Sequence, residues 1–346
     1  PCMPSDQDVA PMLQQAAALH NPPAARRAIG VVIPALNAAA TIRRCLGAAL
    51  GALDRWRAGG GEVTVVDNGS TDGTWEMLTA EYGTRVRLLQ DRAATVAGLR
   101  NRGARVTSGD LLSFIDADCE IGPEYFIHVS EALDGSGADA TGAPYSLPND
   151  PHWIERTWHE LHVNDQAGAV RWLYGGNLVL QRAAFDAVGG FDEELVTGED
   201  IDLCERLRGR GFRLHQDPRV KTVHLGNPRS LGAFCRQQLW HGLGAWQSAR
   251  GLDKPLVMTV AHGSATVAAL TYSWSSELSP LTALGLVALA QLPVPAATSA
   301  FRIIQTRRFA NPVASILLYD LYYWCRLVAL LLAPMLGRKA RWLLRR

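Results

Sequence analysis

Acidic residues follow two strand-like segments of the sequence in a pattern suited to metal binding. Asp67 follows the run 62–66, and Asp116 and Asp118 follow a second run at 110–115. If the second strand continued to Asp118, both of its aspartates would point to one face, which is unfavourable without a cation between them. Oxygen ligands suit Mg²⁺ or Mn²⁺, which can be shared with the phosphates of a substrate. The pattern therefore predicts a divalent-metal site.

A second group of candidate residues lies further along the chain. Glu199 and Asp200 follow a glycine-rich turn and precede a segment with helical spacing. Carboxylates in the first turn of a helix commonly serve its dipole, and a catalytic base is the alternative. His224 ends an alternating run at 220–226 and is either a structural histidine or a ligand. From the residues alone, both alternatives stay open.

The segments around these residues alternate between strand and helix patterns. Apolar or β-branched runs predict strands, helical spacing predicts helices, and Asn37 is placed as the N-cap of a helix that ends near Leu53. The predicted strands are 29–34, 62–67, 86–89 and 110–115, and the other predicted helices are 75–82 and 96–106. Such alternation indicates an α/β fold with a mostly parallel sheet. Ligands of such sheets bind beyond the carboxyl ends of the strands, where the three aspartates converge.

Composition and charge bound the class of protein. The 346 residues include 34 Lys or Arg and 33 Asp or Glu, and the net charge of +1 gives no support to nucleic-acid binding. From Arg302 onward, however, the chain has nine basic residues and only one acidic residue, Asp320. A basic tail on a neutral-to-acidic body is typical of a domain held at an anionic membrane surface. The six cysteines form no C-x-x-C pattern, so no zinc or redox motif is indicated.

The C-terminal third is apolar enough to predict membrane helices. Between residues 255 and 301 the only formally charged side chain is Glu277. This length fits two spans, 256–274 and 281–301, joined by a polar turn, and the alternative is an apolar hairpin in the core of a soluble domain. The segment 313–336 mixes aromatic and charged residues between two basic flanks, which favours a helix at the membrane interface. We therefore divide the chain into a flexible leader (1–28), an α/β domain (29–254) and a membrane-associated helical region (255–346).

Seven sequence blocks, taken in order, resemble those of the family 2 glycosyltransferases. Together they span from about Ile29 to about His241. The blocks are VVIPALN (31–37), VVDNGSTDGT (65–74), RNRG (100–103), FIDAD (114–118), GGN (175–177), GGFDE (189–193) and GEDIDL (198–203). The resemblance implies a GT-A fold, which is Rossmann-like, with a mostly parallel central sheet flanked by helices.

The resemblance also implies roles for individual residues. Asp200 would be the general base that activates the acceptor hydroxyl, and Glu199 would orient it. Asp118, Asp116 and His224 would hold Mg²⁺ or Mn²⁺. The residues implied in binding the nucleotide diphosphate sugar are Pro34, Ala35, Asn37, Asp67, Arg100, Asp116, Gly176 and Asn177.

These implications predict an inverting transferase that moves a sugar onto a membrane-proximal acceptor, either lipid-linked or a polysaccharide precursor. Its predicted location is the inner membrane, with the catalytic domain facing the cytoplasm. The Q-x-x-R-W motif of polymer-building members is absent near Gln237, which favours single additions. Tryptophans 153, 158, 172, 240 and 246 are either sugar platforms or core residues. The alternatives are a catalytically degenerate scaffold of the same fold and a sugar-phosphate nucleotidyltransferase, which would need a basic, glycine-rich loop after the first strand.

Overall fold

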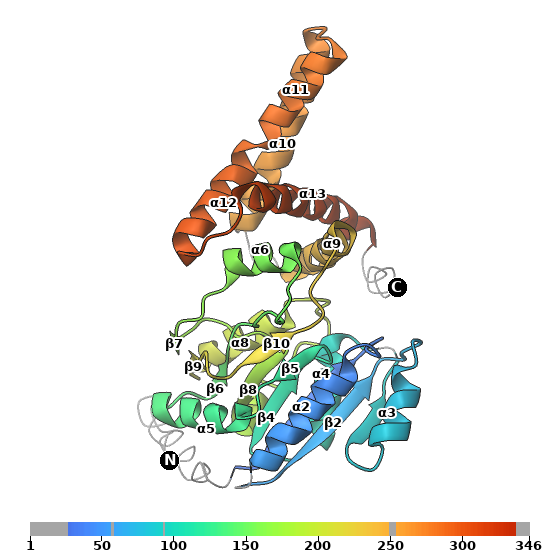
Figure 1. The fold of residues 1–346 in the computed structure, drawn as a ribbon, viewed down its shortest axis with the longest axis vertical. Coiled ribbons are helices and arrows are strands. Elements are labelled where there is room, and N and C mark those ends of the chain that lie inside the picture. The colour runs from blue at the N-terminus through green and yellow to red at the C-terminus, as the bar shows by residue number, and fades with distance from the viewer. Residues whose placement is uncertain (1–26, 57–58, 93, 249–253, 337–346) are drawn as a thin grey trace, which may run out of the picture.

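The computed structural model describes residues 27–56, 59–92, 94–248 and 254–336. Over these residues the chain forms a helix-covered sheet and a separate group of helices beyond it (Figure 1). The large sheet has eight strands in the order β3-β2-β1-β4-β8-β6-β9-β7. These strands are β1 Ile29–Ala35, β2 Gly61–Asp67, β3 Arg87–Gln90, β4 Leu111–Ile115, β6 Ala140–Gly142, β7 Gly168–Ala169, β8 Asn177–Gln181 and β9 Leu214–Gln216. A smaller sheet pairs β5 (Cys119–Ile121) with β10 (Thr222–His224).

The first four strands are parallel and are connected by helices. The connecting helices are α2 Ile42–Arg55, α3 Thr74–Tyr82 and α4 Val96–Val106. Strands β8 and β7 run antiparallel to their neighbours, so the sheet is mostly parallel. This confirms the predicted α/β class. It also brings the carboxyl ends of β1, β2 and β4 to one edge of the sheet, because parallel neighbours end on the same side.

The central strand β1 is buried along its whole length, as its apolar sequence predicts. Its alternate residues belong to two cores, one on each face of the sheet. Val31 and Ile33 pack with residues of α2 and of α5 (Tyr125–Ser136), while Val32 packs with Phe114 and with residues of α8 (Glu199–Gly209). Two short helices complete this part, α6 (Trp153–His162) and α7 (Arg182–Ala187). The sheet is therefore a rigid base for the loops at its edge.

At this edge the predicted N-cap of the first helix differs from the structure, while the predicted end of the strand at 110–115 agrees with it. Helix α2 begins at Ile42, and Asn37 is not its N-cap; Asn37 has a φ of 49° and its Oδ1 accepts a hydrogen bond from the Thr71 backbone N–H (2.9 Å). The loop after β2 thus holds the segment after β1 and delays the helix. Strand β4 ends at Ile115, so Asp116 and Asp118 lie in a turn that is closed by a hydrogen bond from Cys119 N–H to the Asp116 carbonyl (2.9 Å).

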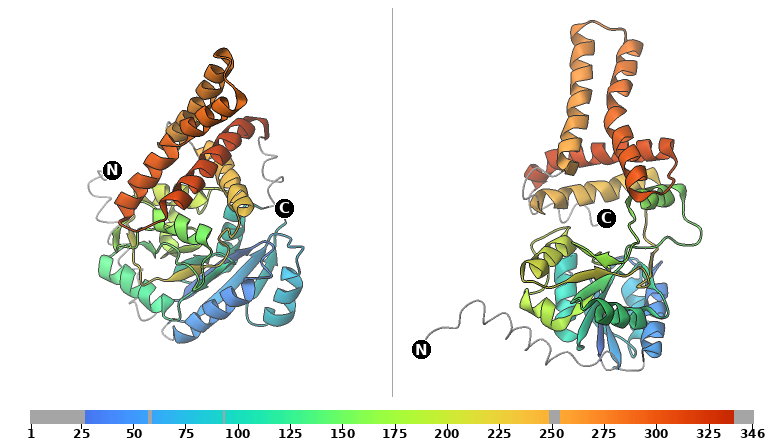
Figure 2. Two further views of the ribbon diagram at one scale, coloured as in Figure 1. Left: turned by 45° about the horizontal axis from the view of Figure 1, so that its top comes forward. Right: turned by 90° about the vertical axis from the view of Figure 1, so that its left-hand side faces the viewer.

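The C-terminal helices form a hairpin and two helices that lie across its base (Figure 2). They are α9 Leu231–Ser248, α10 Lys254–Ser275, α11 Pro280–Gln291, α12 Pro293–Thr306 and α13 Pro312–Leu336. Helix α10 forms one arm of the hairpin, and α11 with α12 forms the other, with the polar turn between Ser275 and Pro280 where it was predicted. Helices α9 and α13 lie between the hairpin and the sheet-containing part, roughly perpendicular to the hairpin.

Two stretches among the described residues are long and apolar enough to span a membrane. They are Pro280–Thr306, which includes the predicted second span, and Pro312–Ala333, which corresponds to the segment predicted to lie at the interface. The predicted first span, now α10, is not one of them. Its polar content gives the reason, since Thr259, His262 and Thr266 are buried there and His262 Nε2 lies 3.2 Å from Asp320 Oδ1 on α13.

Helix α6 joins the sheet-containing part to the helical region. Trp158 packs against Phe234 of α9 and against Tyr319 and Tyr322 of α13, with ring centroids 4.9 to 5.6 Å apart. Arg308, which follows α12, pairs with Glu160 (3.3 Å) and with Asp165. The two parts therefore meet through an aromatic cluster with ion pairs at its border.

Candidate active site

The loops after β1 and β2 form one hydrogen-bonded unit at the edge of the sheet. The Asn37 N–H donates to Ser70 Oγ (2.9 Å), and this hydroxyl donates to Asp67 (2.5 Å). Asp67 is fully buried and also accepts from the Gly69 and Ser70 N–H groups and from Gln90 Nε2, at 2.9 to 3.2 Å. Sequence reasoning missed Ser70, although the run of turn-forming residues around it was the available signal. Asp67 therefore fixes the shape of this loop, whatever else it binds.

Pro34 and Ala35 lie in β1 itself, one or two residues before this unit. Both are buried in the strand, with Ala35 paired to Asp67 of β2.

Arg100 lies at the centre of the site and is 2% exposed. From α4 it donates to Glu199 Oε1 (2.5 Å) on α8 and to Asp116 Oδ1 (2.7 Å) after β4. Its guanidinium also lies over the Phe191 ring, 5.4 Å from the centroid. Arg100 thus links the carboxylates of Asp116 and Glu199. Its position beside the base or phosphates of a donor stays a prediction.

Glu199 and Asp200 begin α8, after Gly198 in the left-handed conformation. Asp200 Oδ2 accepts from the Gly175 N–H (2.9 Å), and its Oδ1 accepts from the Ile201 N–H (2.8 Å). Burial raises the pKa of Asp200 above its ordinary value, against the Gly175 hydrogen bond and the charge of Arg100. Burial likewise raises the pKa of Glu199, and Arg100 opposes that shift. A carboxylate with a raised pKa is a stronger proton acceptor, which suits a general base.

Gly175 and Gly176 lie at positions where a side chain would collide with residues of the site. A Cβ on Gly175 would lie 2.9 Å from Arg100 Nη1, and one on Gly176 would lie 2.7 Å from the Tyr145 hydroxyl and closer still to Asp116. The Gly176 N–H donates to the Tyr145 hydroxyl (3.0 Å). Sequence reasoning missed Tyr145, because nothing in its neighbourhood distinguishes it from a core aromatic residue.

Asn177, the third residue of the block, has a different environment from the one predicted. It is fully buried at the start of β8. Its Nδ2 donates to the Ala143 carbonyl (2.8 Å) and the Val220 carbonyl (3.2 Å), and its Oδ1 accepts from the Tyr125 hydroxyl (2.6 Å). Asn177 therefore joins strands and loops, and a fully buried amide offers no surface to a donor sugar.

Asp118, Cys119 and His224 form a cluster that could hold a metal ion. Their ligand atoms all lie within 4.8 Å of one another, and His224 Nε2 is 3.5 Å from Asp118 Oδ2. The antiparallel pairing of Cys119 with His224 brings them together. Asp116, predicted as a further ligand, is outside this group and bonds to Arg100. The two aspartates of the turn after β4 therefore have different partners: Asp116 binds Arg100, and Asp118 lies beside His224.

The chemistry of this cluster fits a hard divalent cation. Asn227 donates from Nδ2 to the His224 carbonyl (3.1 Å), so its Oδ1 can accept from His224 Nδ1 (3.0 Å). This hydrogen bond leaves Nε2 free for a metal, in the manner of an outer-shell partner. The sulfur of Cys119 is a soft ligand, which hard cations such as Mg²⁺ do not prefer. The carboxylate of Asp118 and the imidazole of His224 remain, a set that suits Mn²⁺ or Mg²⁺ shared with phosphate oxygens.

Sequence comparison decides the family. A sequence model described as "Glycosyl transferase family 2" matches residues 30–190, and one described as "Glycosyl transferase family group 2" matches residues 111–337. The chain belongs to the family 2 glycosyltransferases. The predicted membership is thereby confirmed.

Named relatives of this glycosyltransferase include proteins from archaea and bacteria. Glycosyltransferase AglE of Haloferax volcanii is 27% identical over 63% of this chain and 73% of its own length. Validoxylamine A glucosyltransferase of Streptomyces hygroscopicus subsp. jinggangensis is 31% identical over 60% of this chain and 59% of its own length. The match thus spans little more than half of the second relative.

A solved structure extends the likeness over nearly the whole chain. The mannosyltransferase PcManGT of Pyrobaculum calidifontis, solved in complex with GDP-Man and Mn²⁺, superimposes with a TM-score of 0.56 and 20% identity, over 94% of both chains. At this identity the likeness establishes the fold, which for this glycosyltransferase is GT-A.

Within this glycosyltransferase, seven of the predicted site residues fall into three groups. Asn37 and Asp67 shape the loop edge; Arg100 joins Asp116 to Glu199; and Asp118 lies beside His224. The raised pKa of Asp118 has burial as its main cause, and His224 opposes it. The first two groups are held by hydrogen bonds within the protein, while in the third the ligand atoms of Asp118 and His224 lie close enough together to hold a cation.

Proposed function

We propose that this glycosyltransferase is an inverting, metal-dependent enzyme that uses a nucleotide diphosphate sugar. The observation that carries the proposal is that one site holds both a buried carboxylate, Asp200 beside Arg100, and a cluster of Asp118 with His224 that could hold a cation. The two are connected through Asp116, which Arg100 binds and which lies two residues before Asp118. A general base and a cation site are the two groups that an in-line displacement from a diphosphate needs. The GDP-Man and Mn²⁺ complex of PcManGT is consistent with such a donor and metal.

In the proposed reaction, Asp200 accepts the proton of the acceptor hydroxyl as the hydroxyl oxygen attacks the anomeric carbon. The bond from that carbon to the diphosphate oxygen breaks, and the nucleoside diphosphate leaves with the electron pair, which inverts the anomeric centre. Glu199, held by Arg100, positions the base. A cation bound by Asp118 and His224 would supply positive charge to the diphosphate.

We further propose that the acceptor lies close to a membrane. The hairpin exposes large apolar side chains along its length, with Leu281 80%, Leu284 67% and Ile304 75% exposed. Exposed apolar residues at this density are unfavourable in water and favourable in lipid. The crosswise α9 and α13, with the tyrosines of α13, suit the interface. The catalytic part then faces the cytoplasm from the inner membrane, and the acceptor is lipid-linked or a polysaccharide precursor.

The alternatives predict different behaviour from the purified protein. The experiment is turnover of the full chain in detergent with UDP, GDP and dTDP sugars and Mn²⁺, followed as released nucleoside diphosphate. We expect release from one donor class and loss of release in EDTA. Binding of a donor with no release at all would favour the degenerate scaffold, and release of pyrophosphate from a nucleoside triphosphate with a sugar phosphate would favour the nucleotidyltransferase.

A further inference from the structure

A row of aromatic rings runs from the metal cluster to the surface of the protein. The Tyr145 ring lies 4.8 Å from the His224 ring and 5.1 Å from the Tyr174 ring, between centroids. Trp172 then lies 4.7 Å from Tyr174, in an edge-to-face arrangement. These four residues come from three separate segments of the chain, so the row forms only when the chain is folded. Its outer member is Trp172, which is 42% exposed.

The outer end of this row lies beside the proposed catalytic base. The segment 172–176 runs along the first turns of α8, since the Leu173 N–H donates to Cys204 Sγ (3.4 Å) and the Gly175 N–H donates to Asp200 (2.9 Å). Tyr174 directly precedes Gly175, whose N–H is bonded to Asp200. The exposed ring of Trp172, which packs on Tyr174, therefore belongs to the same short segment that contacts the proposed base.

The other described tryptophans of this half have evident structural contacts. Trp158 packs in the aromatic cluster between α6, α9 and α13, and Trp240 lies against His241. Trp153 is as exposed as Trp172, at 41%, but its ring contact is with His152 on the same helix, apart from the aromatic row. Isolated exposed apolar residues are common and need no function. An exposed indole that continues a partly buried row of rings, in the segment that contacts a candidate catalytic carboxylate, is a different case.

We propose that Trp172, supported by Tyr174, is a stacking platform for a pyranose ring of the acceptor, so that the acceptor is a carbohydrate. This inference rests on the proposed function and specifies its acceptor. One face of a pyranose presents mainly C–H groups, which pack on the flat apolar face of an indole, while its hydroxyls remain free. Stacked on Trp172, the ring would present a hydroxyl toward Asp200.

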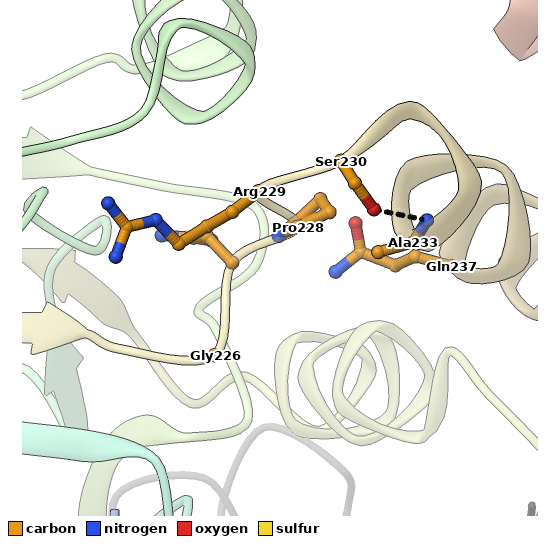
Figure 3. Close-up of a pocket in the computed structure, with 7 residues that line it drawn as sticks. Gly226, Pro228, Arg229, Ser230, Ala233 and Gln237 are labelled. Carbon is orange, nitrogen blue, oxygen red and sulfur yellow. Dashed lines mark hydrogen bonds between the residues drawn. The ribbon is translucent and has the colours of Figure 1, made fainter.

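A cavity lined by the loop after β10 is of a different kind. It has a volume of about 500 Å³ and lies between the loop after β10 and the start of α9 (Figure 3). Its lining includes Arg229, Ser230 and Gln237, and Figure 3 shows the Arg229 guanidinium directed away from Gln237. Arg229 lies 3.6 Å from the buried Glu155. Because these polar groups diverge, the cavity does not form a second sugar platform.

The test uses the full chain in detergent, with octyl β-glucoside, β-galactoside, β-mannoside and β-N-acetylglucosaminide as acceptor probes. Dodecyl phosphate is the sugar-free probe. We expect transfer to at least one glycoside and none to dodecyl phosphate. Trp172→Ala should raise KM for that glycoside about tenfold, while Trp172→Phe should stay within about threefold.

Trp153→Ala is the matched control, with the same exposure and the same residue type, and we expect it to behave as wild type. Equal loss in Trp153→Ala would overturn the platform, and so would transfer to dodecyl phosphate that Trp172→Ala leaves intact. If Trp172→Ala instead weakens flotation with lipid vesicles and leaves KM unchanged, the indole is a membrane anchor. A wild-type enzyme that hydrolyses a donor but uses no glycoside also contradicts the platform. Failure of the proposed function is distinct, because wild type would then release no nucleoside diphosphate from any donor.

Discussion

Gly176 gives the sharpest structural test of the site. Its main chain passes between Asp116 and Tyr145, and its N–H donates to the Tyr145 hydroxyl (3.0 Å). In Gly176→Ala, the added Cβ would lie 2.7 Å from that hydroxyl and closer still to the Asp116 carboxylate. Both neighbours must move, and neither is the free end of a mobile side chain, because Asp116 is bonded to Arg100 (2.7 Å).

The size of the effect follows from these distances. Ordinary contact begins at 3.4 Å, so the Tyr145 hydroxyl must retreat by at least about 0.7 Å and Asp116 by more. A displacement on the order of 1 Å breaks the bond between Asp116 and Arg100, whose loss costs about 1 to 3 kcal/mol for a partly buried group. Misplacement of reacting groups by this distance typically lowers turnover about 100-fold. We therefore expect transfer to fall about 100-fold, with a melting temperature lower by a few degrees.

The assay is the release of nucleoside diphosphate by purified Gly176→Ala, with thermal unfolding measured on the same sample. Gly135→Ala is the control, since Gly135 is exposed in α5 and a Cβ there would meet nothing within 4 Å. This control should keep full activity and gain slightly in stability, because alanine is the better helix former. Activity of Gly176→Ala within threefold of wild type, at an unchanged melting temperature, would refute the packing that we describe between Asp116, Gly176 and Tyr145.

Three further predictions address the charges and the helical region. The charge of Arg100 lowers the pKa of Glu199 and of Asp200. Arg100→Met should therefore move the acid limb of the kcat/KM profile to higher pH, and Arg100→Lys should move it less. An acid limb that stays in place in Arg100→Met would contradict this linkage. Asp118→Asn should weaken both Mn²⁺ and nucleoside diphosphate binding in calorimetric titrations, and equal wild-type affinity with and without EDTA would exclude the metal role. The full chain should float with lipid vesicles, and a reporter fused after Arg346 should be active only in the cytoplasm; recovery in the soluble fraction without detergent would argue against the membrane.

Much of the sheet could be predicted from local sequence. The apolar runs of β1 and β4 and the cap-like loop after β2 identify their elements without tertiary information. Helix α4 begins and ends where predicted, at Val96 and Val106, because Thr95 caps it through its side chain. Asn37 was misplaced because its partner, the Thr71 N–H, is more than thirty residues away. Local capping rules do not include such a competitor.

In the site, too, local sequence predicts which residues carry charge, while their contacts depend on distant parts of the chain. The pattern of carboxylates could be read from the sequence, but their partners could not. Arg100 meets Glu199 across 99 positions of the chain, and Asn177 meets Tyr125 across 52. In the structure Arg100 joins two carboxylates, and the buried Asn177 joins β8 to neighbouring loops. Neither set of contacts could be predicted from sequence spacing. Ion pairing between distant residues depends on the topology of the sheet, which sequence spacing alone does not encode.

In the helical region, amino-acid composition alone does not predict how the helices pack. Helix α10 is apolar in outline, yet the structure buries His262 on it beside Asp320 of α13. Local sequence patterns do not predict the pairing of these two residues, which lie 58 positions apart. Helix α13 has the composition of a span and lies across the hairpin, so its length alone does not define its orientation.

The most direct test of the account is Asp200→Asn, measured for transfer and for donor binding on the same preparation. The substitution keeps the size and the acceptor oxygen that receives the Gly175 N–H, but it removes the proton-accepting carboxylate. We predict that transfer falls by about 10² or more, while affinity for the nucleoside diphosphate with Mn²⁺ changes less than about threefold. Near-normal transfer by Asp200→Asn, with transfer abolished in Glu199→Gln, would show that the base is the other carboxylate; full activity of both variants would contradict the proposed site.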